Sequence, residues 1–394
     1  MSVQTPAPRK KKTGRNILLV ILALLLVAAV GVGAYVYSIG SAWNNNTQKI
    51  ENSESAFPNE DGSIPTDQLD TFKKNMAEEG QANKDVTITN DSGKDLSSDI
   101  DKNGNGILDA DEESSDGSQP KNHERPAETG ATNILLMGSD SRAGTAESAT
   151  VKGQRADSLM LLHVPEDGSN AYLISIMRDT WVNIPGYGPA KINAALDHGG
   201  VALQVSAIEQ LLDTRIDHIA EVDFEGFKGL VDSMDGVTVN VPLSFEGDGY
   251  TYTAGPQKMD GEEALTFVRQ RYQFSDGDYQ RVRNQRAFIR GVFDTLKSRG
   301  VLNNATEFKN MVTTMAPYLT VDEGLDAGSI VSIASPMISN PNFGLKMMTL
   351  PNAGTGWSSD GQSIVVVDLN ANQELSNALK NETMDNYVAT HGAD

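Results

Sequence analysis

The chain of 394 residues contains no cysteine. Thiol catalysis and cysteine metal sites are therefore excluded, and an exported domain of this size would be held together by its core rather than by disulfides. A serine nucleophile is disfavoured as well, because Ser139 and Ser141 lack the G-x-S-x-G pattern of a nucleophile elbow. Positive charge is scarce, since 32 lysines and arginines face 53 aspartates and glutamates, for a net charge of -21. This balance argues against nucleic acid as a partner.

The negative charge is unevenly distributed along the chain. Residues 44–130 contain 20 acidic against 8 basic residues, a net charge of -12 and more than half of the total. The same stretch is rich in Asn, Ser and Gly and poor in aromatic and β-branched residues, so it cannot bury enough apolar surface to offset the entropy cost of ordering. We therefore predict a mostly flexible acidic stalk over residues 40–130. The rest of the chain is only mildly acidic, so its arginines form a local positive site.

A membrane anchor is predicted near the amino terminus. Residues 17–39 are uncharged and exceed the roughly 20 residues that a membrane-spanning helix needs. The basic run RKKKTGR precedes them, so residues 1–16 should be a cytoplasmic tail and the chain after a single span should lie outside the cell membrane. A cleaved signal peptide is the alternative, but its apolar region has only about 7 to 15 residues. Tyr35, Tyr37 and Trp43 would lie in the interfacial aromatic belt.

Residues 101–112 fit the pattern D-x-[DN]-x-[DN]-G-x5-E of a calcium-binding loop at every fixed place. The predicted Ca²⁺ ligands are Asp101, Asn103, Asn105, the carbonyl of Ile107, Asp109 and the bidentate Glu112. The flanking residues lack the paired helices of a regulatory EF-hand, so we expect the weak affinity of extracellular modules, roughly 0.1 to 1 mM. A solvated acidic linker is the alternative interpretation.

The composition of the sequence changes at about residue 131, from mostly polar to alternating apolar and amphipathic runs. Apolar runs typical of strands (NILLMG, SLMLLHV, AYLISIM and VTVNV) alternate with helix-like stretches as far as residue 385. Near-continuous apolar strands separated by helices predict an α/β sandwich whose sheet is buried on both faces. Residues 131–385 should form this one domain, and residues 386–394 a loose tail. His163, within an apolar run, is predicted to be a core histidine.

Carboxylates stand at the ends of the first predicted strands. Asp140 follows the first strand and Asp157 precedes the second, so the two could share a hard divalent cation. Arg178 and Asp179 follow the third strand. If these strands are neighbours, the side chains meet at one rim of the sheet, where open α/β folds place ligands. Lys191 could also contact a ligand, or could only support the local packing.

Arginines cluster in two groups between residues 269 and 290: Arg269, Arg271, Arg281, Arg283, Arg286 and Arg290. On the second predicted helix Arg281 and Gln285 are four residues apart and share a face. Arginine offers a planar donor fork to phosphate oxygens, and several together can neutralise a pyrophosphate. Surface salt bridging is the alternative. A metal site plus arginines, without a cysteine or serine nucleophile, indicates phosphoryl transfer by charge stabilisation.

Four motifs resemble, in order and spacing, the LytR-CpsA-Psr family of bacterial cell-wall proteins: NILLMGSDSR, RADSLMLLHV, AYLISIMRDTWVNIPGYGPAKINAALDHGG and MDGEEALTFVRQRYQFSDGDYQRVRNQ. The resemblance runs from about Asn133 to Phe288 and more weakly to about residue 385. It implies an α-β-α sandwich with a central mixed sheet and a hydrophobic cleft for a polyprenyl tail, with the pyrophosphate at its mouth. The implied activity transfers a glycopolymer from a membrane-lipid carrier, a polyprenyl pyrophosphate, to peptidoglycan through a phosphodiester, assisted by Mg²⁺ or Mn²⁺.

The resemblance also implies roles for individual residues. Asp140 and Asp157 would hold the metal and, with Arg178, act in catalysis. The phosphates would be bound by Arg178, Arg269, Arg271, Arg281 and Gln285. The chain departs from the family at Met177, where the family's S-I-P-R-D has a proline, so a fixed backbone angle is lost before Arg178. It departs again where the family's R-Q-Q is replaced by N-Q-R at residues 284–286.

The function predicted from the sequence is that of a membrane-anchored phosphotransferase acting outside the membrane. Two alternatives remain open at this stage. The same site could act as a pyrophosphatase with water as the acceptor. The domain could instead bind a lipid or polysaccharide without catalysis, regulated by calcium through the stalk.

Overall fold

The structure, a computed structural model, describes residues 38–50, 53–65, 89–90, 124–139, 156–301, 304–340 and 342–393. The predicted tail 1–16, the predicted calcium loop 101–112 and Asp140 lie outside these residues, as does the predicted membrane span apart from residues 38–39. Among the residues that the structure describes, no helix is both long enough and apolar enough to cross a membrane.

A seven-stranded sheet forms the centre of the domain, in the order β1-β13-β8-β3-β4-β5-β14. Its strands are β1 (Gln48–Lys49), β13 (Thr320–Val321), β8 (His218–Val222), β3 (Thr132–Ser139), β4 (Ala156–Val164), β5 (Ala171–Ile176) and β14 (Leu345–Thr349). β3 pairs in parallel with β8 and antiparallel with β4, and β5 pairs antiparallel with β4 and in parallel with β14. The sheet is therefore mixed, as the resemblance implied. Every residue of β5 is buried, as expected for a strand covered on both faces.

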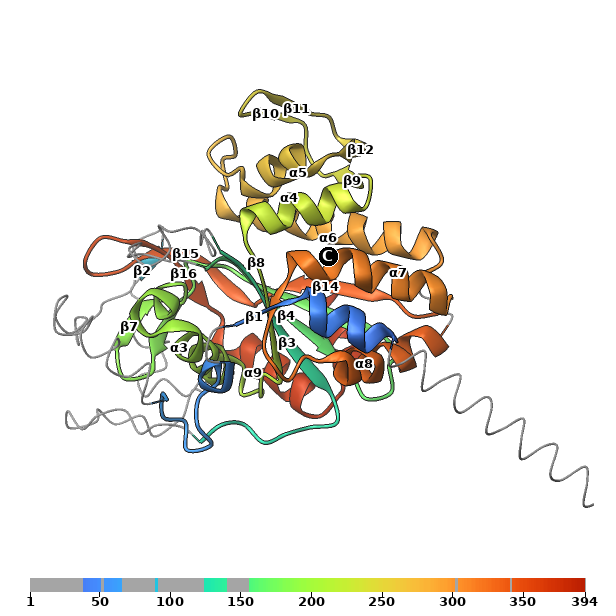
Figure 1. The fold of residues 1–394 in the computed structure, drawn as a ribbon. Coiled ribbons are helices and arrows are strands. Elements are labelled where there is room, and N and C mark those ends of the chain that lie inside the picture. The colour runs from blue at the N-terminus through green and yellow to red at the C-terminus, as the bar shows by residue number, and fades with distance from the viewer. Residues whose placement is uncertain are drawn as a thin grey trace, which may run out of the picture.

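Helices cover both faces of this sheet (Figure 1). On one face lie α3 (Ala194–Leu212), α9 (Leu369–Lys380) and α10 (Met384–His391); on the other lie α6 (Asp278–Ser298), α7 (Ala305–Met315) and α8 (Ala327–Ser339). α3 is apolar on most sides because it is buried, and it kinks where Gly200 adopts φ 68°. An Asp or Asn side chain accepts a backbone N–H in the first turn of α7, α8 and α9, at Asn304, Asp326 and Asp368. The same holds for α4 (Phe224–Ser233) and α5 (Gly261–Arg269), at Asp223 and Asp260.

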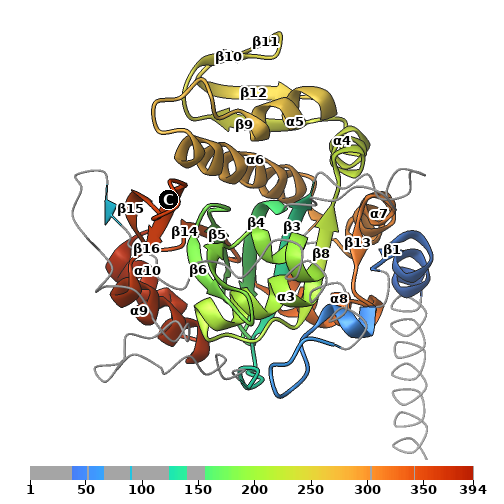
Figure 2. The same ribbon diagram turned by 90° about the vertical axis from the view of Figure 1, so that its left-hand side faces the viewer.

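A smaller layer lies beyond α6, on the side away from the central sheet (Figure 2). It contains α4 (Phe224–Ser233), β9 (Val237–Val241), β10 (Phe245–Gly247), β11 (Tyr250–Tyr252), β12 (Gly255–Met259) and α5 (Gly261–Arg269). The sequence run VTVNV had suggested another strand of the central sheet. It forms β9 instead, which alternates buried and exposed residues and pairs only with β12 in a two-stranded sheet.

Two small sheets flank the central one. β6 (Trp181–Ile184) pairs with β7 (Gly188–Lys191), and β15 (Asn352–Trp357) pairs with β16 (Ser363–Val367) and β2 (Thr89–Asn90). Among the described residues, η1 (Ser53–Ala56) and η4 (Ala316–Tyr318) are 3₁₀ helices. The backbone N–H of Val365 in β16 donates to the carbonyl of Asp179 at 2.9 Å, which joins β16 to the loop after β5.

The described parts of the predicted stalk, at 40–50, 53–65, 89–90 and 124–130, pack on the domain. Residues 38–46 are helical, and β1 adds to the sheet edge beside β13. Ile39 and Trp43 are buried in one apolar cluster, and the Trp43 indole donates to the Leu325 carbonyl at 2.6 Å. The placement of Trp43 in an interfacial belt is therefore wrong, because its indole finds a partner within the protein.

Two further segments also pack on the domain, contrary to the sequence-based expectation. In each of them a few apolar or charged side chains contact partners that are distant in the sequence. Arg125, in the predicted stalk, donates to the buried Glu209 carboxylate of α3 at 2.6 Å. The predicted loose tail 386–394 contains most of α10, where Tyr387 and Val388 pack against the core cluster that includes α3 and α9.

Candidate functional site

Arg178 follows the buried strand β5 and lies at the centre of the site. Its Nη1 donates to Asp157 Oδ1 at 2.5 Å, and its Nε lies 3.4 Å from Asp278 Oδ2 and 3.8 Å from Asp179 Oδ2. Asp179 in turn pairs with Lys191 at 3.1 Å. The structure thus brings together the ends of β4, β5 and β7 and the start of α6, which are far apart in the sequence.

The segment around Arg178 is held without the proline that the family motif has at position 177. Met177 is buried and packs against Val282 of α6 and Val365 of β16. Its carbonyl accepts from the backbone N–H of Thr180 at 2.9 Å and from the Thr180 hydroxyl at 2.6 Å. The Arg178 carbonyl accepts from the N–H of Asn193 at 3.3 Å. Packing and hydrogen bonds therefore restrict this turn where a fixed φ angle is absent.

Asp157 projects from an irregularity in the ladder between β3 and β4. Ser139 pairs with Ala156 and Gly138 with Ser158, which leaves Asp157 as an extra residue on β4. Bulges of this kind re-aim a side chain and are common beside active sites. Ser139, the last residue of β3, pairs with Ala156, the residue before Asp157.

Asp278, the first residue of α6, collects a cluster of arginines. Arg281 Nη2 donates to Asp278 Oδ2 at 2.8 Å, Arg178 Nε lies 3.4 Å from the same oxygen, and Arg271 Nη1 lies 3.7 Å from Oδ1. A role for Asp278 was not predicted from the sequence. The available signal was its place within S-D-G-D-Y-Q-R, three residues before Arg281 and therefore on the same face of the helix.

Burial governs the electrostatics of this cluster. It raises the pKa of the Asp278 carboxyl, against the opposing effect of Arg281 and Arg178, and it lowers the pKa of the Arg281 guanidinium despite Asp278. Burial also opposes the charge on Arg178, but the carboxylates of Asp278, Asp179 and Asp157 together raise its pKa. An ion pair whose desolvation outweighs its attraction contributes little stability, and such groups gather at functional sites.

Other arginines predicted for the site have different surroundings. Arg269, at the end of α5, is exposed and lies over the Phe224 ring at 4.2 Å. Arg286 is buried and donates to the Thr349 hydroxyl of β14, so it points to the central sheet. Arg283 pairs with Asp276 on the surface. Of the predicted phosphate ligands, Arg178, Arg271 and Arg281 therefore lie together, because each forms an ion pair with Asp278.

The two remaining positions of the N-Q-R departure face α5. Gln285 Nε2 makes a long contact of 3.5 Å with the Val268 carbonyl. Asn284 is fully buried, where it accepts from Gln280 at 2.9 Å and donates to the Phe267 carbonyl at 3.4 Å. Asn284 therefore belongs to the packing between α5 and α6, where an arginine would need a partner for its buried charge.

The residues at the rim suit a hard cation in one respect. The Asp157 side chain is 36% exposed and offers carboxylate oxygens, the ligands that Mg²⁺ prefers. Within the described part of the chain, no three His, Cys, Asp or Glu side chains are grouped as a metal site would need. A site here would thus use Asp157, Asp140 and oxygens from substrate and water, which is typical of Mg²⁺.

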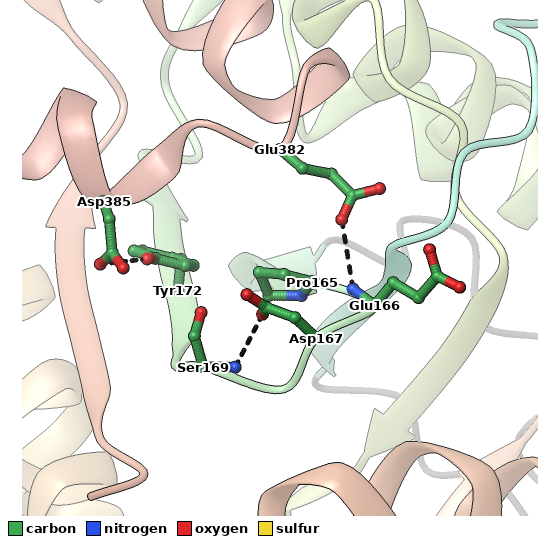
Figure 3. A pocket seen from close by; sticks show the side chains of 7 residues that line it. All are labelled: Pro165, Glu166, Asp167, Ser169, Tyr172, Glu382 and Asp385. Atoms are coloured by element: carbon green, nitrogen blue, oxygen red, sulfur yellow. Dashed lines mark hydrogen bonds between the residues drawn. The ribbon is translucent and has the colours of Figure 1, made fainter.

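A separate cavity of about 460 Å³ lies at the other end of β4 and β5 (Figure 3). Its lining includes Glu166, Asp167, Glu382 and Asp385, and Tyr172 donates to Asp385 at 2.5 Å. β4 extends for nine residues, so this cavity is roughly 25 Å from Asp157. Its acidic lining would repel a phosphate.

A mixed sheet covered by helices on both faces, with arginines and carboxylates at one rim, defines an α/β domain with a candidate anion-binding site. The model of the LytR_cpsA_psr family matches residues 98–381, and the chain belongs to this family. The match confirms the resemblance found in the sequence. It begins within the stretch predicted as a stalk.

Known proteins agree with this assignment. The chain is 33% identical over 250 residues to a protein of Enterococcus faecalis named polyisoprenyl-teichoic acid–peptidoglycan teichoic acid transferase TagU, covering 63% of this chain and 78% of that protein. It is 29% identical over 290 residues to the cell wall biosynthesis protein LcpA of Corynebacterium glutamicum, covering 62% and 54%. The crystal structure of B. subtilis TagV shares the fold, with a TM-score of 0.53 at 22% identity, covering 66% of this chain and 99% of that one.

Proposed function

We propose that this protein is a membrane-anchored phosphotransferase that moves a glycopolymer from a polyprenyl-pyrophosphate carrier to peptidoglycan. The observation that carries the proposal is the convergence of Arg178, Arg271 and Arg281, from three separate segments, at one partly buried place. Such an array of arginines fits a pyrophosphate, which carries two adjacent charged groups, better than it fits a ligand with a single carboxylate. Family membership and the name of the E. faecalis relative support the same reaction, with teichoic acid as one candidate polymer.

In the proposed reaction, a hydroxyl oxygen of peptidoglycan attacks the phosphorus next to the glycan. The bond from that phosphorus to the bridging oxygen breaks, the hydroxyl gives up its proton to solvent, and polyprenyl monophosphate leaves. The product is a phosphodiester between glycan and peptidoglycan. Arg178, Arg271 and Arg281 would bind the phosphate oxygens and stabilise the charge that grows on the leaving group. Lys191 would hold Asp179, and through it the orientation of Arg178.

Asp157 and Asp140 would hold a divalent cation, Mg²⁺ or Mn²⁺. When bound, that cation would polarise the phosphoryl oxygens and neutralise part of their charge. In the structure the Asp157 carboxylate accepts from Arg178, so the same carboxylate links the proposed metal position to the proposed phosphate position. This hydrogen bond supports a metal position beside the phosphate position.

The polyprenyl tail would lie between the central sheet and α6. Half-buried apolar side chains gather there around the cluster of Met160, Leu173 and Phe343. They come from the sheet, from α6 and from α8: Leu136, Leu162, Ile289, Phe293, Ile333 and Met337. Side chains left partly exposed in an apolar layer suit a hydrocarbon chain. The proposed membrane span and the extracellular location of the domain would keep this layer near the lipid, and the proposed Ca²⁺ loop would lie on the same side.

A transfer assay tests the proposal. The full chain with Mg²⁺, a polyprenyl-pyrophosphate glycan and peptidoglycan should attach the glycan, and Asp157→Asn should lower the rate by roughly 100-fold. Asp167→Asn, at the distant acidic cavity, is the matched control and should keep the wild-type rate. Equal product from wild type and Asp157→Asn would contradict the assigned site. Free phosphorylated glycan would indicate a pyrophosphatase, and tight binding without turnover a non-catalytic binder.

A further inference from the structure

The carboxylate of Asp278 stands among the guanidinium groups proposed to hold the pyrophosphate. Its two oxygens contact Arg281 at 2.8 Å, Arg178 at 3.4 Å and Arg271 at 3.7 Å. The Asp278 side chain is only 16% exposed. The three arginines come from the loop after β5, the loop after α5 and the first turn of α6, so no single element fixes their spacing.

An acidic residue in the first turn of a helix often serves only the helix dipole. Asp278 has more contacts and is more deeply buried than an interaction with the helix dipole requires. Partners from two other elements reach its carboxylate, and the burial that this demands opposes the charges of both Asp278 and Arg281. A residue that served the helix alone could do so at the surface, where the cost of burial is absent.

We propose that Asp278 is a positioning residue, which holds Arg178, Arg271 and Arg281 at the spacing that the two phosphates of the substrate then use. This inference rests on the proposed function. Without a central anion, three guanidinium groups repel one another and separate. With it, they are already in place when the pyrophosphate arrives, which lowers the reorganisation needed during the reaction.

The inference has a kinetic consequence that a merely structural role lacks. The Asp278 carboxylate repels the incoming phosphates even as it orients the arginines. Its removal should therefore strengthen ground-state binding and weaken transition-state stabilisation, which separates KM from kcat.

Asp278→Asn keeps the shape of the side chain and removes its charge. In the transfer assay with the full chain, kcat should fall by roughly 10- to 100-fold while KM for the lipid pyrophosphate stays equal or falls. Asp276→Asn, two residues earlier and paired only with the surface Arg283 in the contacts described, is the matched control and should leave both constants unchanged. Unchanged kcat in Asp278→Asn, or a raised KM with wild-type kcat, overturns the inference.

Two further measurements keep the test decisive. If Asp278→Asn fails to fold, as a lost thermal transition would show, Asp278→Glu restores the charge and should recover at least part of kcat; no recovery in a folded Glu variant overturns the inference. If wild type transfers nothing, the proposed function fails, and titration with inorganic pyrophosphate then tests Asp278 by itself. Asp278→Asn should bind that probe roughly fivefold more tightly than wild type. Equal or weaker binding overturns the positioning role.

Discussion

Trp43→Ala tests whether the segment before β1 belongs to the domain. Trp43 is 5% exposed, packs in one cluster with Ile39, Phe308 and Val321, and donates to the Leu325 carbonyl. Truncating a buried aromatic side chain to alanine costs about 3 to 5 kcal/mol. The unpartnered carbonyl adds about 1 kcal/mol, for a total loss of unfolding free energy of about 4 to 6 kcal/mol. A domain of about 250 residues has an unfolding entropy of roughly 0.5 kcal/mol per kelvin, so Tm should fall by roughly 8 to 12 °C.

Trp357→Ala provides the matched control, because this tryptophan of β15 is 49% exposed. Its loss should change the free energy of unfolding by less than about 0.5 kcal/mol and Tm by less than about 1 °C. Thermal unfolding of the full chain, followed by far-ultraviolet circular dichroism, compares the two variants. If both tryptophans shift Tm equally, or Trp43→Ala leaves Tm unchanged, the segment contributes no stability and the reasoning is refuted.

Two further predictions concern the core and the site. Burial lowers the pKa of His163 from 6.5 to about 4, so between these values the unfolded chain takes up a proton that the folded chain does not. Stability should therefore fall by up to about 3 kcal/mol as the pH drops from 6.5 to 4, and urea unfolding of His163→Gln should lack this part of the pH dependence. On α6, Arg281→Ala should lower kcat by roughly 100-fold or more. Arg283→Ala, which loses the pair with Asp276 and hydrogen bonds to Gln280 but no contact with Asp278, should stay within about twofold of wild type. Equal losses of kcat in the two variants would contradict this prediction. They would show that only the total positive charge of α6 matters and that the location of Arg281 does not.

The apolar runs of the sequence were sufficient to predict β3, β4 and β5, because strands buried on both faces leave an unbroken pattern. The edge of the sheet could not be predicted in this way. β1 and β13 are two residues each, and they pair across a separation from Gln48 to Thr320 that no local signal encodes. β9 was misassigned because an apolar strand has a similar sequence pattern in a central sheet and in the small two-stranded sheet that it forms with β12.

The arginines of the candidate site could be predicted from the sequence, but the aspartate among them, Asp278, could not. Arginine density in the sequence indicated Arg271 and Arg281, and the position after the third predicted strand indicated Arg178. The structure brings these three together. Arg269 was grouped with them by spacing, but a helix end can turn either way, and this one lies over Phe224. Asp278 was missed because its significance depends on partners from three elements, which only the folded chain brings into contact.

The most direct test of the central claim is the ratio of products in a single reaction of the full chain. Each transfer should release one polyprenyl monophosphate for each glycan that becomes linked to peptidoglycan through a phosphodiester. Measuring the lipid phosphate by mass spectrometry and the linked glycan after peptidoglycan digestion should give a ratio close to one, with both products lost in Arg178→Ala. Release of polyprenyl monophosphate without linked glycan, or linkage that persists undiminished in Arg178→Ala, would contradict the account.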